Sequence, residues 1–315
     1  MSSFGHLSVM AREVIEGLNL KSSGVYIDGT LGGAGHSKLI LEGSAPNGFL
    51  IGIDLDDDAL AEGRRVLKEF EGRFELIKGN FRDMLILTKE ILGGRKVDGI
   101  VLDLGVSSYQ LNEASRGFSF MKEARLDMRM DKSQEVSAFE IVNEYSVDEL
   151  KNIFWNYGEE KKSLTAAKAI IEAREQKPIE TTTELASILE KAIGAKGFTR
   201  GKKIHPATKV FQALRIAVND ELGSVEEGLK GAFDLLGKGG RLAVISFHSL
   251  EDRIVKNFLR DGEKGCICPV DFPRCRCGRV PTMKLVGRKA QKPGEEEIEY
   301  NPRARSARLR VAEKL

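Results

Sequence analysis

Acidic residues close several apolar runs of the sequence, and a glycine-rich turn follows the first of them. Asp28 directly precedes the turn Gly29–Gly35, Asp54 ends the next apolar run, and Asp103 ends a later one. Glycines in such a turn let the backbone approach a ligand closely. Carboxylates accept hydrogen bonds from hydroxyl groups and attract cations. This set predicts a binding site for a small molecule that carries hydroxyl groups and positive charge.

The glycine turn separates two classes of ligand. A dinucleotide-binding turn has the pattern G-x-G-x-x-G, but Lys38 stands where the third glycine would follow Gly33 and Gly35. An acid at the position of Asp54 accepts hydrogen bonds from ribose hydroxyls both in dehydrogenases and in S-adenosylmethionine (AdoMet) methyltransferases, so Asp54 does not separate the two. Asp28 would repel a pyrophosphate but suits a sulfonium cation. We therefore predict AdoMet as the ligand, with Phe81 beside its adenine. The spacing D-x-T-x-G-x-A-G also resembles the first motif of Rossmann-like methyltransferases.

Asp103 is the first candidate for catalysis. It begins the turn D-L-G-V, in the position where amino-group methyltransferases carry an acid or amide followed by Pro-Pro-aromatic. The lone pair of a base amino group is delocalised into the ring, so a carboxylate and a backbone carbonyl that accept its hydrogens make the nitrogen more nucleophilic. His248 ends the last apolar run of this type and is the candidate proton acceptor, with water as the alternative.

These residues require an α/β fold to bring them together. Five apolar runs, at 24–28, 48–54, 73–80, 97–104 and 240–247, alternate with segments of helical period, which is typical of an open, mainly parallel sheet. Between Ser137 and Gly194 only helical patterns occur. We predict a discontinuous sheet domain, residues 1–111 and 206–315, with a helical insertion over 112–205. The run SARLRVAEKL near the end is predicted to be an edge strand.

Composition places few limits on function. The chain has 315 residues and a formal net charge of only +2, so any nucleic-acid surface must be local. No run approaches the ~20 apolar residues of a membrane span, and the first residues lack the order of a signal peptide. A cytoplasmic protein is expected, with no membrane partner.

The cysteines are confined to one short segment, CICPVDFPRCRCG, as two C-x-C pairs. Four thiolates in this span could bind zinc, and reduced free thiols or a stabilising disulfide are the alternatives that we favour. No metal is assigned.

Basic residues in and near the insertion are candidates for RNA contact. Arg116, Arg125 and Arg129 lie among aromatic residues and methionines, which suits phosphate contact and base stacking. The block Lys196–Lys209 contains no acid, and a later helical pattern puts Arg215 on one face with Asn219. Salt bridges within the fold or solvated faces are the alternatives. The residues predicted to contact RNA are Arg116, Arg129, Lys202, Lys203, Lys209, Arg215 and Asn219.

Taken in order, the motifs resemble the bacterial family of ribosomal RNA small subunit methyltransferase H, also called MraW. The matching stretches include YIDGTLGGAGHS, IGIDLDDDAL, LDLGVSSYQL, LDMRMD, HPATKVFQALRIAVNDEL, ISFHSLEDRIVK and NPRARSARLRV. The resemblance implies a Rossmann-like class I AdoMet-dependent methyltransferase with a helical insertion domain. It also implies N4-methylation of a cytidine in the decoding centre of 16S rRNA. The family's cofactor contacts carry over to Ala34, Gly35, His36, Asp54, Phe81, Asp103 and Gln110.

Two other functions are weighed against this one. A nicotinamide-dependent oxidoreductase would explain the glycine turn and Asp54, and a non-enzymatic RNA-binding module would explain the basic segments. The missing third glycine and Asp28 argue against the first, and the intact set of cofactor residues argues against the second. The choice between free rRNA and the assembled small subunit as substrate stays open, as does the oligomeric state, a homodimer included.

Overall fold

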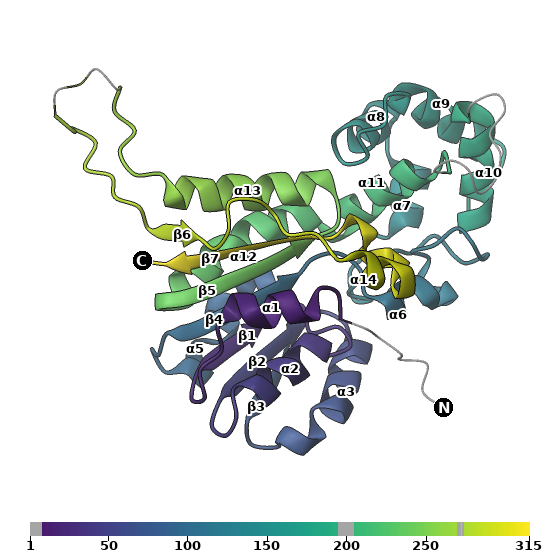
Figure 1. Cartoon of the computed structure of the whole chain (residues 1–315). Coiled ribbons are helices and arrows are strands. Elements are labelled where there is room, and N and C mark those ends of the chain that lie inside the picture. The colour runs from purple at the N-terminus through teal and green to yellow at the C-terminus, as the bar shows by residue number, and fades with distance from the viewer. Residues whose placement is uncertain (1–7, 195–204, 270–271, 273) are drawn as a thin grey trace. The chain divides into compact units, whose positions relative to one another are not determined.

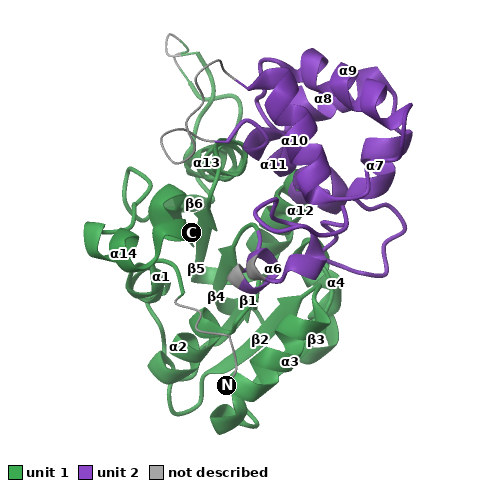
Figure 2. Cartoon of the chain, turned by 90° about the vertical axis from the view of Figure 1, so that its right-hand side faces the viewer, with its two compact units in different colours: residues 1–105, 222–315 green, residues 106–221 purple. Residues whose placement is uncertain are grey.

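The computed structural model describes residues 8–194, 205–269, 272 and 274–315. The chain divides into two compact units, residues 1–105 with 222–315, and residues 106–221 (Figure 2). The helical unit thus spans residues 106–221, whereas the sequence predicted an insertion over 112–205. The difference arises because helix α11 (Thr208–Asn219) buries its apolar residues Val210, Phe211 and Leu214 in the core of the second unit.

The first unit is built on a seven-stranded sheet with the order β3-β2-β1-β4-β5-β7-β6 (Figure 1). Its strands are β1 (Val25–Asp28), β2 (Phe49–Asp54), β3 (Phe74–Lys78), β4 (Val97–Asp103), β5 (Leu236–Ser246), β6 (Met283–Leu285) and β7 (Arg308–Lys314). The first five strands are parallel, and β7 is antiparallel to both of its neighbours. All five predicted parallel strands are confirmed.

The prediction of an edge strand near the end of the chain is wrong. Strand β7 lies between β5 and β6, and the short β6 is the strand at the edge. Alternation shows that one face of a strand is buried but not whether both of its edges are paired. A strand of three residues leaves no periodic signal, so the sequence did not reveal the neighbour that covers β7.

Helices cover both faces of this sheet. They are α1 (Ala11–Leu18), α2 (Gly35–Gly43), α3 (Asp57–Val66), α4 (Met84–Leu87), α5 (Lys89–Leu92), α12 (Glu221–Leu235), α13 (Ser249–Glu263) and α14 (Glu295–Tyr300), with 3₁₀ turns at Lys68–Phe70, Phe81–Asp83 and Pro302–Ser306. Alternate residues of the strands point to opposite faces. Tyr26 packs in a core with α1, α2 and α3, whereas its neighbour Ile27 packs in a core with α12 and α13. The two cores hold the strand ends rigidly.

The second unit is helical. Its helices are α6 (Ser108–Asn112), α7 (Ala138–Glu144), α8 (Val147–Asn156), α9 (Ser163–Arg174), α10 (Thr182–Ile193) and α11, with a 3₁₀ turn at Ala114–Arg116. Helix α10 begins at a threonine N-cap, in which the Thr181 hydroxyl accepts a hydrogen bond from the N–H of Glu184 at 3.2 Å. Leu185 and Leu189 bury the same face of α10. None of the helices in the described part of the chain has the length and apolar character that crossing a membrane requires.

Candidate active site

Three acidic residues end neighbouring parallel strands. Asp28, Asp54 and Asp103 are the last residues of β1, β2 and β4, and β1 lies between the other two. The chain runs outward from β1 to β3 and then returns to β4 on the other side of β1. Ligands of open α/β sheets bind beyond the carboxyl ends of the strands at such a reversal. The predicted grouping of the three carboxylates is confirmed.

The glycine turn is tied to two of these carboxylates. Gly32 has a φ of 49°, which favours glycine, and its N–H donates to Asp54 Oδ2 at 2.8 Å. Ala34 also has a positive φ of 59° and directly precedes α2. Asp28 Oδ1 accepts from the N–H of Thr30 at 3.1 Å. The turn is thereby fixed on β1 and β2, with the first turn of α2 directed toward the strand ends.

Asp28 is buried, and its carboxylate accepts two hydrogen bonds around the turn. The Ser37 hydroxyl donates to its Oδ2 at 2.7 Å, so each carboxylate oxygen has a partner. Burial raises its pKa above the ordinary range, and His36 and the two hydrogen bonds partly offset this rise. Asp28 therefore shapes the turn and contributes negative charge to the site.

Asp54 also accepts two backbone N–H groups. Gly32 contacts one of its oxygens, and the N–H of Asp56 contacts the other at 2.9 Å. Burial raises the pKa of Asp54 to about 6, while these hydrogen bonds work against the rise. Each carboxylate oxygen has two lone pairs. Asp54 can therefore hold the turn and still accept hydroxyl groups of a ligand.

Asp103 differs from the other two carboxylates. Its Oδ1 is buried and has no hydrogen-bond partner among the described residues. Its N–H donates to the Thr30 hydroxyl at 2.6 Å, which joins the end of β4 to the glycine turn. Burial raises the pKa of Asp103 to about 7; His36 lowers it, and the charges of Asp28, Glu251 and Glu297 add to the rise. An unpaired buried acceptor is costly, which is typical of a ligand-binding position.

His36 lies beside Asp103 and is itself fixed. Its Nε2 is 2.9 Å from the carbonyl oxygen of Val9, and its Nδ1 is 3.8 Å from Asp103 Oδ2. A carbonyl can only accept, so Nε2 carries a hydrogen and the ring presents Nδ1 to Asp103. His36 is therefore held by the backbone of Val9, with its Nδ1 facing the Asp103 carboxylate at a distance beyond a hydrogen bond.

Asn80 and Phe81 follow β3, where the adenine was expected. The Phe81 ring packs closely against Gly228 of α12, where an added Cβ would come within 2.4 Å of it. Asn80 accepts from the N–H of Arg82 at 3.0 Å and donates to Ser224 Oγ at 3.1 Å. These contacts fix the segment, and the half-buried ring keeps an exposed part.

His248 begins helix α13. Its Nδ1 accepts from the N–H of Glu251 at 3.4 Å, and its Nε2 lies 3.1 Å from Glu251 Oε1. Glu251 is completely buried and its Oε2 accepts from the N–H of Phe247 at 2.9 Å. His248 therefore has a capping role at the end of β5, and proton acceptance by this residue stays a prediction.

The sequence matches the model of the MraW methylase family over residues 3–315. The chain belongs to the MraW methylase family.

Relatives of similar length match from end to end. Two proteins named ribosomal RNA small subunit methyltransferase H, from Geobacter sp. (strain M21) and Citrifermentans bemidjiense, are 53% and 52% identical over 315 residues, covering 100% of this chain and of each relative. The match to the solved structure of an rRNA methylase from Streptococcus thermophilus is 10% identical, covers 97% of this chain and 93% of that chain, and has a TM-score of 0.41.

AdoMet is the methyl donor of this methylase, and the described residues fit it. The three strand ends carry carboxylates, and one of them keeps a buried oxygen without a described partner. This donor set suits a cationic ligand with hydroxyl groups and disfavours a pyrophosphate. The nicotinamide alternative is therefore set aside.

Gln110, the remaining predicted cofactor residue, belongs to the second unit of this MraW methylase. It is buried, and its Oε1 accepts from the N–H of Ser107 at 3.0 Å in a capping box at the start of α6. Its contact with the cofactor stays a prediction.

Two of the predicted RNA-binding arginines are used inside the second unit. Arg116 is only 4% exposed, and its guanidinium donates to the carbonyls of Arg129 and Met130 at 3.1 and 2.9 Å. Arg129 forms two 2.8 Å contacts with the carboxylate of Asp127. Both arginines therefore follow the alternative interpretation of the sequence, in which they pair with other groups of the fold instead of RNA. A buried guanidinium such as that of Arg116 cannot reach a phosphate in this conformation.

The polar residues predicted on one face of α11 also form hydrogen bonds and an ion pair within the protein. Asn219 is 7% exposed, accepts from the N–H of Met130 at 2.8 Å and donates to the carbonyl of Met128 at 2.8 Å. Arg215 forms a bidentate ion pair with Glu221, with both N···O distances at 2.8 Å. The exposed Lys209 donates to the carbonyl of Glu159 at 2.9 Å. Lys202 and Lys203 lie outside the described residues.

Sequence reasoning missed a hollow on the second unit. On helix α8, Leu150 and Phe154 are buried, whereas Trp155 is 57% exposed. The hollow has a volume of about 500 Å³. Its lining residues are Lys151, Asn152, Trp155, Lys161, Lys162, Ser163, Leu164 and Thr165. The missed signal was a tryptophan among lysines, which suits base stacking and phosphate contact.

Proposed function

We propose that this MraW methylase transfers a methyl group from AdoMet to the N4 amino group of a cytidine in the decoding centre of 16S rRNA. Family membership and the name shared by the full-length relatives support rRNA of the small subunit as the substrate. The nucleotide and the position of the methyl group are inferred from the chemistry of the site and from the motif resemblance.

The buried, unpartnered Oδ1 of Asp103 is the observation that carries the choice of an amino group. An exocyclic amino group has two hydrogens, and each requires an acceptor when the base enters a dry site. Asp103 accepts one of them, and a backbone carbonyl of Leu104 or Gly105 accepts the other. Both acceptors return electron density to nitrogen and hold it in line with the methyl group.

Methylation at carbon 5 of the same base is the main competing chemistry. That carbon becomes nucleophilic only after a nucleophile, usually a thiolate, adds to the ring. The cysteines of this chain all lie between Cys266 and Cys277. Helix α13 begins next to the strand ends and spans 15 residues, so its far end, where this segment starts, is about 22 Å away. Carbon methylation is therefore disfavoured.

The reaction divides among the residues at the strand ends. Bound AdoMet supplies an electrophilic methyl group on a sulfonium. Asp54 accepts the ribose hydroxyls, and Phe81 lies beside the adenine. Asp28 fixes the glycine turn and adds negative charge. Nitrogen gains the methyl group and loses one proton, which Asp103 can accept and pass to water because its pKa of about 7 suits a general base.

RNA recognition falls to exposed residues of the second unit. The hollow around Trp155 offers an aromatic face, and Lys151 and Lys161 at its rim offer positive charge. Lys209, an exposed lysine of the same unit, is a further source of positive charge. Single-stranded RNA is bound by this combination of stacking and phosphate contact.

Labelled AdoMet, incubated with the enzyme and either free 16S rRNA or isolated small subunits, tests the proposal. Nucleoside analysis of the RNA is expected to show N4-methylcytidine, mapped to the decoding centre. The Asp103→Ala variant, checked for native folding, serves as the inactive control. A methyl group on carbon 5, on a ribose or on another region of the RNA would overturn the assignment.

A further inference from the structure

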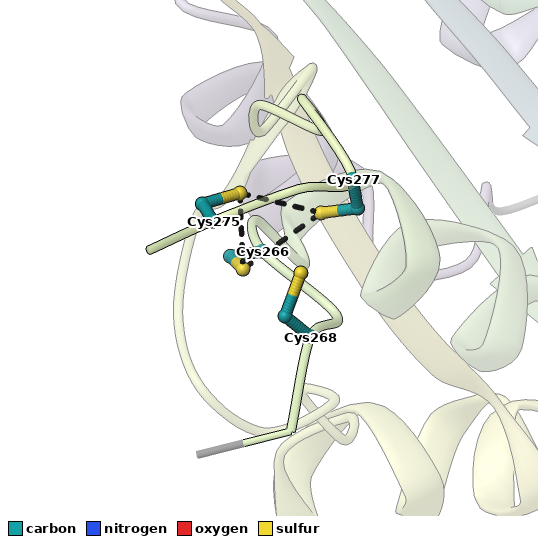
Figure 3. A group of neighbouring side chains, drawn as sticks. All are labelled: Cys266, Cys268, Cys275 and Cys277. Carbon is teal, nitrogen blue, oxygen red and sulfur yellow. Dashed lines mark hydrogen bonds between the residues drawn. The ribbon is translucent and has the colours of Figure 1, made fainter. Parts of the chain in front are cut away.

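The four cysteines form a cluster apart from the strand ends. They lie in the connection between α13 and β6, which extends beyond the sheet in Figure 1. Cys266 and Cys268 come from one arm of this connection, and Cys275 and Cys277 come from the other. Figure 3 shows their side chains converging on one point.

The sulfur positions fit a tetrahedron around a single ion. Cys275 Sγ lies 3.3 Å from Cys266 Sγ and 3.6 Å from Cys277 Sγ, and the third side of this triangle is 3.7 Å. Cys268 completes the group, in which all four Sγ atoms lie within 4.8 Å of one another. Zn–S bonds of about 2.3 Å in a tetrahedron place sulfurs about 3.8 Å apart. The cysteines are free, and these three S···S distances are well beyond a disulfide bond of about 2.05 Å.

Backbone N–H groups point at these sulfurs. The N–H of Arg276 donates to Cys268 Sγ at 3.3 Å. The N–H of Cys268 contacts the thiol of Cys266, and those of Ile267 and Arg279 contact Cys277. Such donors stabilise thiolates, which are the form that binds a metal, and they fix the orientation of the ligands.

The described residues of the surrounding segment form no apolar core of their own. Three of their larger apolar side chains are exposed: Ile267 at 50%, Phe272 at 44% and Val280 at 69%. A peptide segment that buries so little apolar surface needs another source of order to hold four cysteines together, and a metal ion supplies it.

We propose that Cys266, Cys268, Cys275 and Cys277 bind one Zn²⁺ in a structural Cys₄ site. Four protein ligands leave no open position for water or substrate, so the ion joins the two arms of the connection and takes no part in methyl transfer. The distance along α13 separates it from the strand ends.

Metal analysis of the full-length protein tests this site. Protein prepared under reducing conditions, without chelators and with any affinity tag removed, is expected to contain one zinc per chain. Replacement by cobalt should give the strong thiolate-to-cobalt absorption of a tetrahedral four-sulfur site. The double variant Cys266→Ser/Cys268→Ser should lose both the zinc and the cobalt spectrum, whereas Arg274→Ala, in the same segment, should keep them.

AdoMet binding and circular dichroism confirm that each variant is folded, since neither sheet core includes the cysteines. Cys266→His provides a second check, because Cys₃His is also a zinc ligand set and should retain the ion with an altered cobalt spectrum. The site would be overturned if reduced protein takes up no zinc from excess zinc salt. Zinc retained by the double-serine variant, or two disulfides in freshly isolated protein, would overturn it equally.

Discussion

Three similar carboxylates differ in what their oxygens contact. Asp28 and Asp54 each accept two hydrogen bonds from the glycine turn or its surroundings, so they hold the site together. Asp103 has a buried oxygen with no partner in the described part of the chain. The residue with the unsatisfied acceptor is the one expected to act in the reaction.

Replacing Asp103 should reduce turnover far more than stability. Asp103→Ala removes the acceptor that positions the amino nitrogen, an effect concentrated in the transition state, and kcat should fall by roughly 10²–10⁴-fold. Asp103→Asn keeps the shape but loses the charge and is the matched control for packing. Single-turnover methylation and thermal melting measure the two effects. A kcat within a few-fold of the parent's would assign the amino-group acceptor to another residue.

AdoMet affinity should increase with pH. The pKa of Asp103 is raised to about 7, so below that pH its carboxyl group is largely neutral in the free protein. The cationic AdoMet binds more tightly when this group is a charged carboxylate. Calorimetry from about one pH unit below to one above this value should show Kd falling and then levelling off. By the same linkage, the free protein loses stability as pH rises from the ordinary aspartate pKa through about 7.

Asp103→Asn is the control for that titration. It should remove the step near pH 7 and leave a smaller one near 6 from Asp54, whose pKa is also raised. If the parent protein binds AdoMet with an affinity that does not change over this range, both carboxyl groups are ionised in the free protein and the assignment fails.

Asp54→Ala should weaken AdoMet binding. Hydrogen bonds to a charged acceptor are worth about 1.5–3 kcal/mol, which corresponds to roughly a 10- to 100-fold rise in Kd. Because Asp54 also holds Gly32, Asp54→Asn is needed as the variant that preserves one carbonyl oxygen. Unchanged affinity in a folded Asp54→Ala protein would remove the ribose assignment.

At the scale of elements, the amide of Asn219 joins helix α11 to the loop before α7, and the amide of Gln134 adds a second link by donating to the carbonyl of Val218 at 3.1 Å. Asn219 contacts the backbone of both Met128 and Met130. Asn219→Ala should lower the free energy of unfolding by about 1–3 kcal/mol, because it leaves buried backbone groups without partners. Urea denaturation measures this loss, with Lys209→Ala as the exposed control on the same helix. A variant that keeps its stability but loses RNA affinity would restore the sequence interpretation of Asn219 as a substrate contact.

The sequence located the strands and the acidic strand ends because both leave local signals. Apolar runs marked β1, β2, β3, β4 and β5, and each strand-end aspartate followed its run directly. Neither β6 nor α14 leaves a comparable periodic signal. Partners distant in the sequence, such as Arg116 with the carbonyl of Met130 or Asn219 with Met128, depend on tertiary packing. A polar residue that faces a ligand and one that is buried against a backbone look alike in the sequence.

For the molecule as a whole, RNA affinity should depend on basic segments outside the cofactor site. Neutralising Lys202, Lys203 and Lys209 together should weaken RNA binding and flatten its salt dependence by roughly 0.7 in slope per lost phosphate contact. AdoMet affinity should stay the same. Filter binding across a salt series measures the slope, and Arg64→Ala, a basic residue of α3 in the first unit, is the control. An unchanged slope would make this block a solvated face.

The position of the second unit in the chain has a consequence for how quickly the protein folds. Strands β4 and β5 are direct neighbours, with Asp103 opposite Ile245, yet the whole of residues 106–221 separates them in sequence. Closing a flexible loop on the order of a hundred residues costs about 4 kcal/mol of chain entropy. If the helical unit collapses first, it replaces that loop with a preformed connection. Folding of the insert should therefore precede pairing of β4 with β5, and mutations that slow it should delay formation of the cofactor site.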